Sequence, residues 1–263
     1  MTGEPTVRPL PRPGEAHFWF GEATGEPHRD VGLLSADERA RCARLTRPED
    51  RAGFVAVWAG IRRAVAGYLG AAPGAVRLER AGGGRSGLRL AGVPGEPVFL
   101  SSARSGELWL LGLAVGDPLG VDLEHVRPID TEGLAGRCLA PPERRQVRSL
   151  GADARRTALL RAWTRKEALM KAADLPAGTD PRHVVVHPAV TTGTVRAGLP
   201  TGDDWTVRDL RLRDAVQAAL ARPLSCTGQV RIHDTTAAGR TTRPTATTTT
   251  TTTTLGPGTG PES

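Results

Sequence analysis

Residues 120–124 read Gly-Val-Asp-Leu-Glu, an alternation of apolar and acidic side chains that predicts a β-strand. On a strand, Asp122 and Glu124 share one face, while Val121 and Leu123 point to the opposite face and into the core. Two neighbouring carboxylates repel each other unless solvent or a cation lies between them. Oxygen ligands with no His or Cys nearby suit Mg²⁺ better than zinc. The alternative is a solvated edge strand with no bound ion.

Residues 163–171 read Trp-Thr-Arg-Lys-Glu-Ala-Leu-Met-Lys, which has the spacing of a helix. Trp163, Glu167 and Lys171 then form one row at i, i+4 and i+8. An exposed Glu–Lys pair would explain two of them, but the row contains a large aromatic, which favours a cleft. The only two lysines among 35 basic residues, Lys166 and Lys171, also lie in this stretch. A lysine ammonium can give up a proton when partly buried, which arginine cannot do, so this row is a candidate functional site.

The rest of the chain supplies helices and strands around these two stretches. A helix is expected over 49–69, after Pro48 and before Gly70, and a shorter one begins at Ser35 with Glu38 completing a capping box. Two further helices are expected over 141–149 and 153–173. Strands are expected over 76–80, 97–101, 108–115, 119–124, 184–187, 205–212 and 216–221.

The order of these elements repeats along the chain. A shift of 105 residues places Leu34 on Leu139 and Glu38 on Glu143. We therefore predict an α+β fold of two similar halves related by a pseudo-two-fold axis, each with a long helix packed on a small antiparallel sheet. The predicted division is a flexible N-terminus (1–14), a first half (15–118), a second half (119–234) and a disordered Thr/Pro/Gly-rich tail (235–263).

Composition narrows the class of protein. The chain has 263 residues, a net charge of +7 and 39% hydrophobic residues, too many for a wholly disordered protein. It contains no apolar run of membrane-spanning length and no signal peptide, so we expect a cytoplasmic protein. The basic balance favours an anionic partner, although GC-rich coding also explains the arginines. With 4% aromatic residues and no recognition motif, a basic nucleic-acid-binding module is the less favoured alternative.

The paired stretches resemble the signature of the Sfp-type 4′-phosphopantetheinyl transferases, a G-[IV]-D-[IVL]-E strand followed by a W-[ST]-x-K-E-x-x-x-K helix. Both motifs match at every defining position. Residues 34–39, 68–70 and 105–107 also look like parts of this family, as does 139–143, which resembles its F-S-x-x-E segment. The resemblance implies the two-half fold of these enzymes.

The resemblance also implies an activity, which is transfer of 4′-phosphopantetheine from coenzyme A to a serine of an acyl, peptidyl or polyketide carrier protein, with release of 3′,5′-ADP. Asp122, Glu124 and Glu167 would hold Mg²⁺ against the CoA diphosphate. Glu143 or Glu167 would help to deprotonate the serine, and Lys171 would contact the diphosphate and the leaving group. A site within one chain implies a monomer.

The first half would then supply contacts to the nucleotide. Arg85 lies in the glycine-rich turn where the family carries a lysine, and Arg41 lies at a basic position of the family. Arg104 replaces the histidine of a Ser-His pair and could bind a 3′-phosphate, whereas Gly53 replaces a residue that is often arginine. These departures leave open a catalytically weakened relative that only binds carrier proteins.

Overall fold

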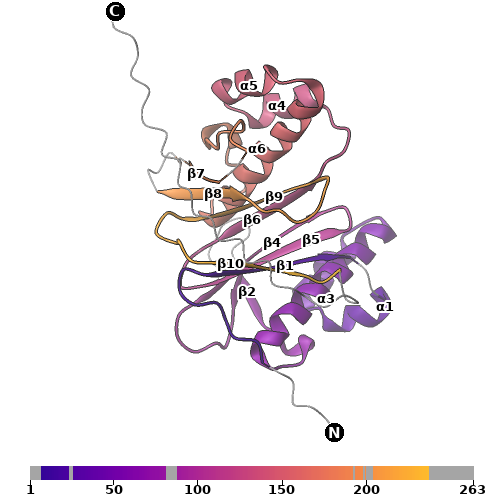
Figure 1. Cartoon of the computed structure of the whole chain (residues 1–263). Helices are drawn as coiled ribbons and strands as arrows, with labels where there is room; N and C mark the ends of the chain where they lie inside the picture. The colour runs from indigo at the N-terminus through magenta and orange to yellow at the C-terminus, as the bar shows by residue number, and fades with distance from the viewer. Residues whose placement is uncertain are drawn as a thin grey trace, which may run out of the picture.

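Two β-sheets lie face to face between two groups of helices, as the computed structural model shows (Figure 1). The structure describes residues 7–23, 26–80, 88–191, 193–197, 199 and 204–236. The predicted Thr-rich tail beyond Thr236 therefore lies outside the described residues. The fold class is α+β, as the sequence predicts.

The first sheet has six strands and the second has four. The first runs in the order β10 (Val230–Asp234), β1 (Ala16–Glu22), β5 (Leu108–Val115), β4 (Val98–Ser105), β3 (Leu88–Leu90) and β2 (Leu78–Arg80). The second runs in the order β6 (Gly120–His125), β9 (Val216–Pro223), β8 (Trp205–Asp209) and β7 (Thr194–Ala197).

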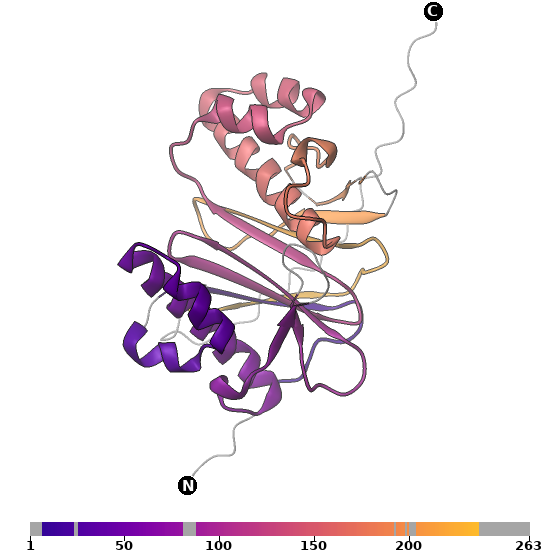
Figure 2. The same ribbon diagram turned by 180° about the vertical axis from the view of Figure 1, so that it is seen from behind.

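The helices cover the two outer faces, as the view from behind also shows (Figure 2). Helices α1 (Pro27–Asp30), α2 (Ala36–Ala43) and α3 (Pro48–Leu69) lie on the side of the first sheet, and α4 (Thr131–Cys138), α5 (Pro141–Arg148) and α6 (Ala152–Ala172) on the side of the second. Short 3₁₀ turns lie at Val31–Leu33, Pro73–Ala75 and Pro181–His183. Among the described residues, none of the helices combines the length and apolar character needed to cross a bilayer.

Three apolar cores fill the spaces between these layers. One lies between α3 and the first sheet and includes Ile61 and Leu111. A second lies between the two sheets and includes Phe18 and Val121. The third lies between α6 and the second sheet and includes Leu169. Both sheets are thus buried on both faces, which explains the almost unbroken apolar run of β5.

The predicted helices are confirmed with small shifts at their ends. The Ser35 hydroxyl accepts from the Glu38 N–H and the Glu38 carboxylate accepts from the Ser35 N–H, which is the expected capping box of α2. Helix α3 ends where Gly70 adopts a left-handed conformation with φ of +57°.

The predicted strand over 184–187 is wrong, because buried cations take the carbonyls that a strand would use. The Arg165 guanidinium donates to Val186 O at 3.2 Å and to His187 O at 2.9 Å. The Lys166 ammonium donates to Val184 O. His187 also adopts a positive φ of 48°, which a strand does not allow. This segment is therefore a loop fastened to α6.

The first sheet is not purely antiparallel, which differs from the expectation. Strand β10 follows the second half in sequence but pairs in parallel with β1, with Phe18 opposite Ile232. An uncovered β1 would leave a row of unpaired backbone groups at the sheet edge. Strand β10 covers that edge and brings the segment that follows the second sheet in sequence into the first sheet.

The two long helices are held by matching ion pairs. In the first half, Arg62 on α3 bonds both oxygens of Glu38 at 3.0 Å and donates to Val76 O at 2.6 Å. In the second, Lys166 on α6 donates to Glu143 at 2.6 Å and to Val184 O. Each glutamate is the third residue of a short helix. Each ion pair joins a long helix to the short helix before it, and the pairs align Arg62 with Lys166, an offset of 104 in the long helices rather than 105.

Candidate active site

Lys171 joins the two sheets at the centre of the candidate site. Its ammonium donates to Asp122 Oδ1 on β6 at 2.7 Å and to Val121 O at 3.1 Å. It also approaches Ser102 O on β4 at 3.5 Å. Both side chains of the Lys171–Asp122 pair are almost buried, with 12% and 10% exposure. The pair therefore places a positive charge where β4, β6 and α6 meet.

Gly120 allows this close approach of α6 to β6. A Cβ atom at this position would lie 1.9 Å from Ala168 O and 2.5 Å from Ala172 N. The glycine of the Gly-Val-Asp-Leu-Glu stretch thus removes the one side chain that would hold the helix away from the strand. As a result, Lys171 on the same helix reaches the backbone oxygen of Val121 directly.

Glu124 and Glu167 lie near this pair, and both add negative charge. The Glu124 carboxylate accepts a hydrogen bond from the Ser105 hydroxyl at 2.7 Å and lies 3.6 Å from Arg127. Glu167 lies in the predicted row with Trp163 and Lys171, and each of these three residues is partly exposed. This row of α6 therefore borders solvent, whereas most of the neighbouring residues on the helix are buried.

The electrostatics of Asp122 show how the acidic groups combine. Burial raises its pKa to about 6, the charge and hydrogen bond of Lys171 oppose this rise, and Glu167 and Glu124 add to it. Asp122 Oδ2 is buried and has no hydrogen-bond partner among the described residues. A second cation beside that oxygen would be favourable, since an unpaired buried acceptor is costly.

These residues fit Mg²⁺ by their chemistry, although they do not form a closed cage. Three carboxylates, one of them with an unpartnered buried oxygen, are donors of the kind that a hard cation prefers. Within the described ranges, no three His, Cys, Asp or Glu side chains are close enough to hold a metal ion by themselves. A ligand such as a diphosphate would have to contribute oxygens.

Glu143 lies apart from this cluster of contacts and is enclosed by protein. Its Oε2 accepts from Lys166 Nζ at 2.6 Å and from Ala140 N at 3.0 Å, and its Oε1 accepts from Val186 N at 3.0 Å. Its side chain is only 4% exposed. Both oxygens are thus committed to fastening α5, α6 and the following loop.

Arg104 and Gly53 are neighbours, although the sequence gives no sign of this. A Cβ atom on Gly53 would lie 2.7 Å from Arg104 Nη2, so the guanidinium lies directly on the helix backbone. Arg104 is exposed, and its Nε donates to Gly106 O at 2.9 Å. The two departures from the family pattern therefore occur at a single place, where an arginine from β4 fills the space beside α3.

Of the other two predicted nucleotide contacts, the structure describes Arg41. Arg41 on α2 lies over the rings of Phe54 and Trp58, at 5.6 Å and 5.7 Å from their centroids. Arg85 lies outside the described residues.

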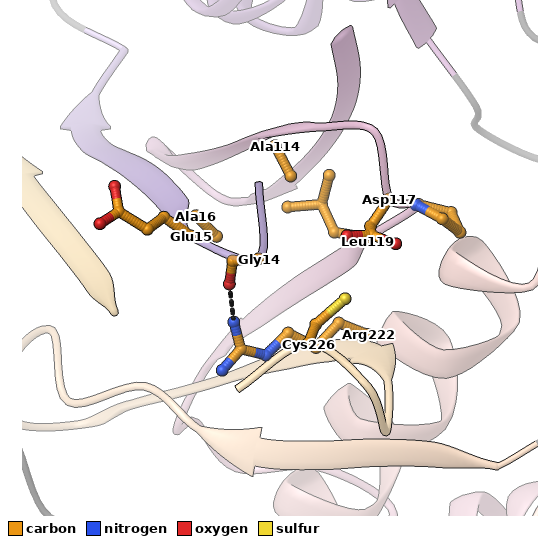
Figure 3. Close-up of a pocket in the computed structure, with 9 residues that line it drawn as sticks. Gly14, Glu15, Ala16, Ala114, Asp117, Leu119, Arg222 and Cys226 are labelled. Carbon is orange, nitrogen blue, oxygen red and sulfur yellow. Dashed lines mark hydrogen bonds between the residues drawn. The ribbon is translucent and has the colours of Figure 1, made fainter. Parts of the chain in front are cut away.

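A small cavity lies elsewhere on the boundary between the sheets (Figure 3). Its volume is about 10 Å³, enough for about one water molecule. Arg222 closes it by donating to Gly14 O at 3.0 Å and to Gly228 O at 3.0 Å. Burial raises the pKa of the Cys226 thiol in its wall to about 11, and Glu15 and Asp117 also line the cavity.

Comparisons with known proteins agree with this geometry. A family model described as the 4′-phosphopantetheinyl transferase superfamily matches residues 118–221. The chain is 31% identical over 214 residues to the 4′-phosphopantetheinyl transferase HetI of Nostoc sp. (strain PCC 7120), covering 79% of this chain and 87% of HetI. It is 33% identical over 141 residues to the putative 4′-phosphopantetheinyl transferase slr0495 of Synechocystis sp. (strain PCC 6803), covering 53% of this chain and 56% of that protein.

Proposed function

The chain belongs to the 4′-phosphopantetheinyl transferase superfamily, and on that premise we propose that it modifies carrier proteins. It would transfer 4′-phosphopantetheine from coenzyme A to a serine of an apo acyl, peptidyl or polyketide carrier, with Mg²⁺. In this reaction the serine oxygen forms a bond to the β-phosphorus of CoA. The bond from that phosphorus to the bridging oxygen breaks, and 3′,5′-ADP leaves.

The observation that carries the proposal is the Lys171–Asp122 pair beside Glu124 and Glu167. Phosphoryl transfer needs charge neutralisation and positioning more than covalent help from the protein. The Lys171 ammonium, 2.7 Å from Asp122, would contact the diphosphate and stabilise the charge that develops on the leaving oxygen. Lysine suits this role because it carries a proton that it can share with that oxygen.

Glu167 is the better candidate for the base that accepts the serine proton. It borders solvent on α6, whereas both oxygens of Glu143 are occupied inside the protein. Asp122, Glu124 and Glu167 would hold Mg²⁺. When bound, the ion neutralises charge on the diphosphate oxygens. The protein groups orient the diphosphate and receive the proton.

The remaining contacts follow from the family pattern. Arg41, Arg85 and Arg104 are proposed to bind the nucleotide phosphates of CoA. A net charge of +7 favours an acidic carrier protein as the partner, because opposite charge speeds encounter. We propose that the protein acts as a cytoplasmic monomer, with the site built from its own two halves.

The test is to incubate the protein with CoA, Mg²⁺ and apo-carriers of the three classes, and to measure carrier mass by mass spectrometry. We expect a phosphopantetheine mass increase on at least one carrier. If none of the carriers gains this mass, the proposed activity is wrong.

Glu167→Gln should lower the transfer rate by about 100-fold or more, because it removes the proposed base and one ligand of the metal. Glu132→Gln, which changes an exposed glutamate paired with Arg148, is the matched control and should keep the wild-type rate. Circular dichroism checks that both variants fold. Full turnover by folded Glu167→Gln would overturn the assignment of this residue.

A further inference from the structure

Two serine hydroxyls join β4 to β6, where the two sheets meet. Ser101 Oγ accepts from the Val121 N–H at 3.0 Å, and Ser105 Oγ accepts from the His125 N–H at 3.2 Å. The serines are four residues apart on one strand, and their donors are four residues apart on the other, so each pair shares a face. Both serines are buried, with 2% and 6% exposure.

The two serines differ in a single contact. Ser105 also donates its hydroxyl hydrogen to Glu124 Oε2 at 2.7 Å. A serine hydroxyl has one hydrogen to donate, so the accepted bond from His125 fixes the oxygen and the carboxylate receives its only hydrogen. Hydrogen bonds to an ionised acceptor are the stronger kind.

The same Glu124 oxygen has a competing partner. Arg127 lies 3.6 Å from Oε2, and its side chain is 58% exposed, so it can draw the carboxylate toward solvent. Without the Ser105 hydroxyl, the attraction of Arg127 for this oxygen would no longer be opposed by the hydrogen bond from β4. Loss of the serine hydroxyl is therefore expected to let the carboxylate turn toward Arg127.

We propose that Ser105 is a positioning residue, which holds the Glu124 carboxylate toward the site from the other half of the molecule. This inference rests on the proposed role of Glu124 as a metal ligand. It extends the site to β4 of the first half, although the three proposed ligands all belong to the second. Groups that orient metal ligands commonly change metal affinity by about 10–100-fold when they are removed.

The experiment measures Mn²⁺ binding to the full chain in the presence of CoA and without a carrier, from the loss of the free Mn²⁺ signal in electron paramagnetic resonance. Ser105→Ala should weaken Mn²⁺ binding by about tenfold or more. Ser101→Ala is the matched control and should stay within about twofold of the wild type, because it loses the same kind of backbone contact and no contact to a carboxylate. Thermal unfolding should show similar decreases in Tm for both variants.

Glu124→Gln distinguishes a failure of the positioning role of Ser105 from a failure of the metal assignment of Glu124. Suppose that Glu124→Gln weakens Mn²⁺ binding, but that Ser105→Ala weakens it no more than Ser101→Ala does. In that case the positioning role of Ser105 is wrong and the metal site stands. If Glu124→Gln leaves Mn²⁺ binding unchanged, the metal assignment itself fails, and the role of Ser105 fails with it. Should Ser105→Ala not fold, Ser105→Cys keeps the volume with a weaker donor, and the same outcomes apply to it.

Discussion

Gly120 shows how the absence of one side chain brings charges together from distant parts of the sequence. Because α6 touches the strand backbone at this point, Lys171 reaches Asp122 and Val121 O without crossing a gap. A glycine in the middle of a strand normally weakens it. Here that cost is offset by the packing of a buried helix on the strand that carries the carboxylates.

Gly120→Ala should destabilise the protein by about 3 kcal/mol or more, because the new Cβ would collide with backbone atoms that cannot rotate away. Gly136→Ala is the matched control. Gly136 lies inside α4 with nothing within 4 Å of a Cβ, and its replacement should stabilise by about 0.5–1 kcal/mol. Urea unfolding of both variants measures the difference, and equal stabilities would contradict this account of the glycine.

At the scale of residues, the sequence predicts which side chains share a face when their spacing matches the period of a strand or a helix. Asp122 and Glu124 share a face because strands alternate, and Lys171 follows Glu167 by one helical turn. Contacts between elements have no such signal. The hydrogen bond from Ser105 to Glu124 and the position of Arg104 over Gly53 both depend on how β4 packs against β6 and α3. The resemblance includes residues 105–107 among the parts similar to the family, but it does not indicate the contact between Ser105 and Glu124.

At the scale of elements, α5 depends on a single buried ion pair. Glu143 caps its own helix through Ala140 N and neutralises Lys166, whose pKa is lowered by burial despite that carboxylate. Breaking such a pair from one side leaves a charge buried without its partner, which is strongly destabilising. The role of Glu143 in stability is therefore expected to exceed any direct role in the reaction.

Glu143→Gln should lower the free energy of unfolding by about 3 kcal/mol while the folded enzyme keeps its kcat. Glu38→Gln removes the matching carboxylate beside Arg62 in the first half and should cost a similar amount. Chemical unfolding and single-carrier kinetics on both variants test this. A Glu143→Gln protein of wild-type stability that had lost its kcat would instead make Glu143 a base.

The elements themselves follow from the sequence to different degrees. Helices α3 and α6 are long enough for their periodicity to be recognised, and β5 has the bounds expected from its apolar run. The segment 184–187 has the composition of a strand, but α6 supplies Arg165 and Lys166 to its carbonyls. Strand β10 was missed because its pairing with β1, more than 200 residues away, leaves no local pattern.

At the scale of the whole molecule, β10 is held through a buried aromatic cluster. The His17 ring on β1 bonds the Tyr68 hydroxyl at 2.9 Å, and the His233 ring on β10 stacks on Trp19 with centroids 4.4 Å apart. Burial is the main cause that lowers the pKa of His17 to about 4. The charged and titratable groups around it are His233, Arg231, Glu15 and Arg8.

Acid should therefore loosen this cluster. Because the folded pKa of His17 is about 4 and the unfolded value is about 6.5, the unfolded chain binds more protons between these pH values, and stability falls as pH falls. Between pH 7 and pH 4.5 the wild type should lose about 2 kcal/mol more than His17→Gln, which cannot titrate. Urea unfolding at both pH values measures this. Both proteins keep Asp122, so its opposite contribution cancels, and equal losses would contradict the prediction.

The position of β10 also has a consequence for synthesis on the ribosome. Strand β1 emerges more than 200 residues before Val230–Asp234, which pairs with it. Until then the nascent first half exposes an unpaired strand edge, the kind of surface that promotes aggregation. A chaperone that shields strand edges should therefore raise the yield of native protein more than one that acts after release.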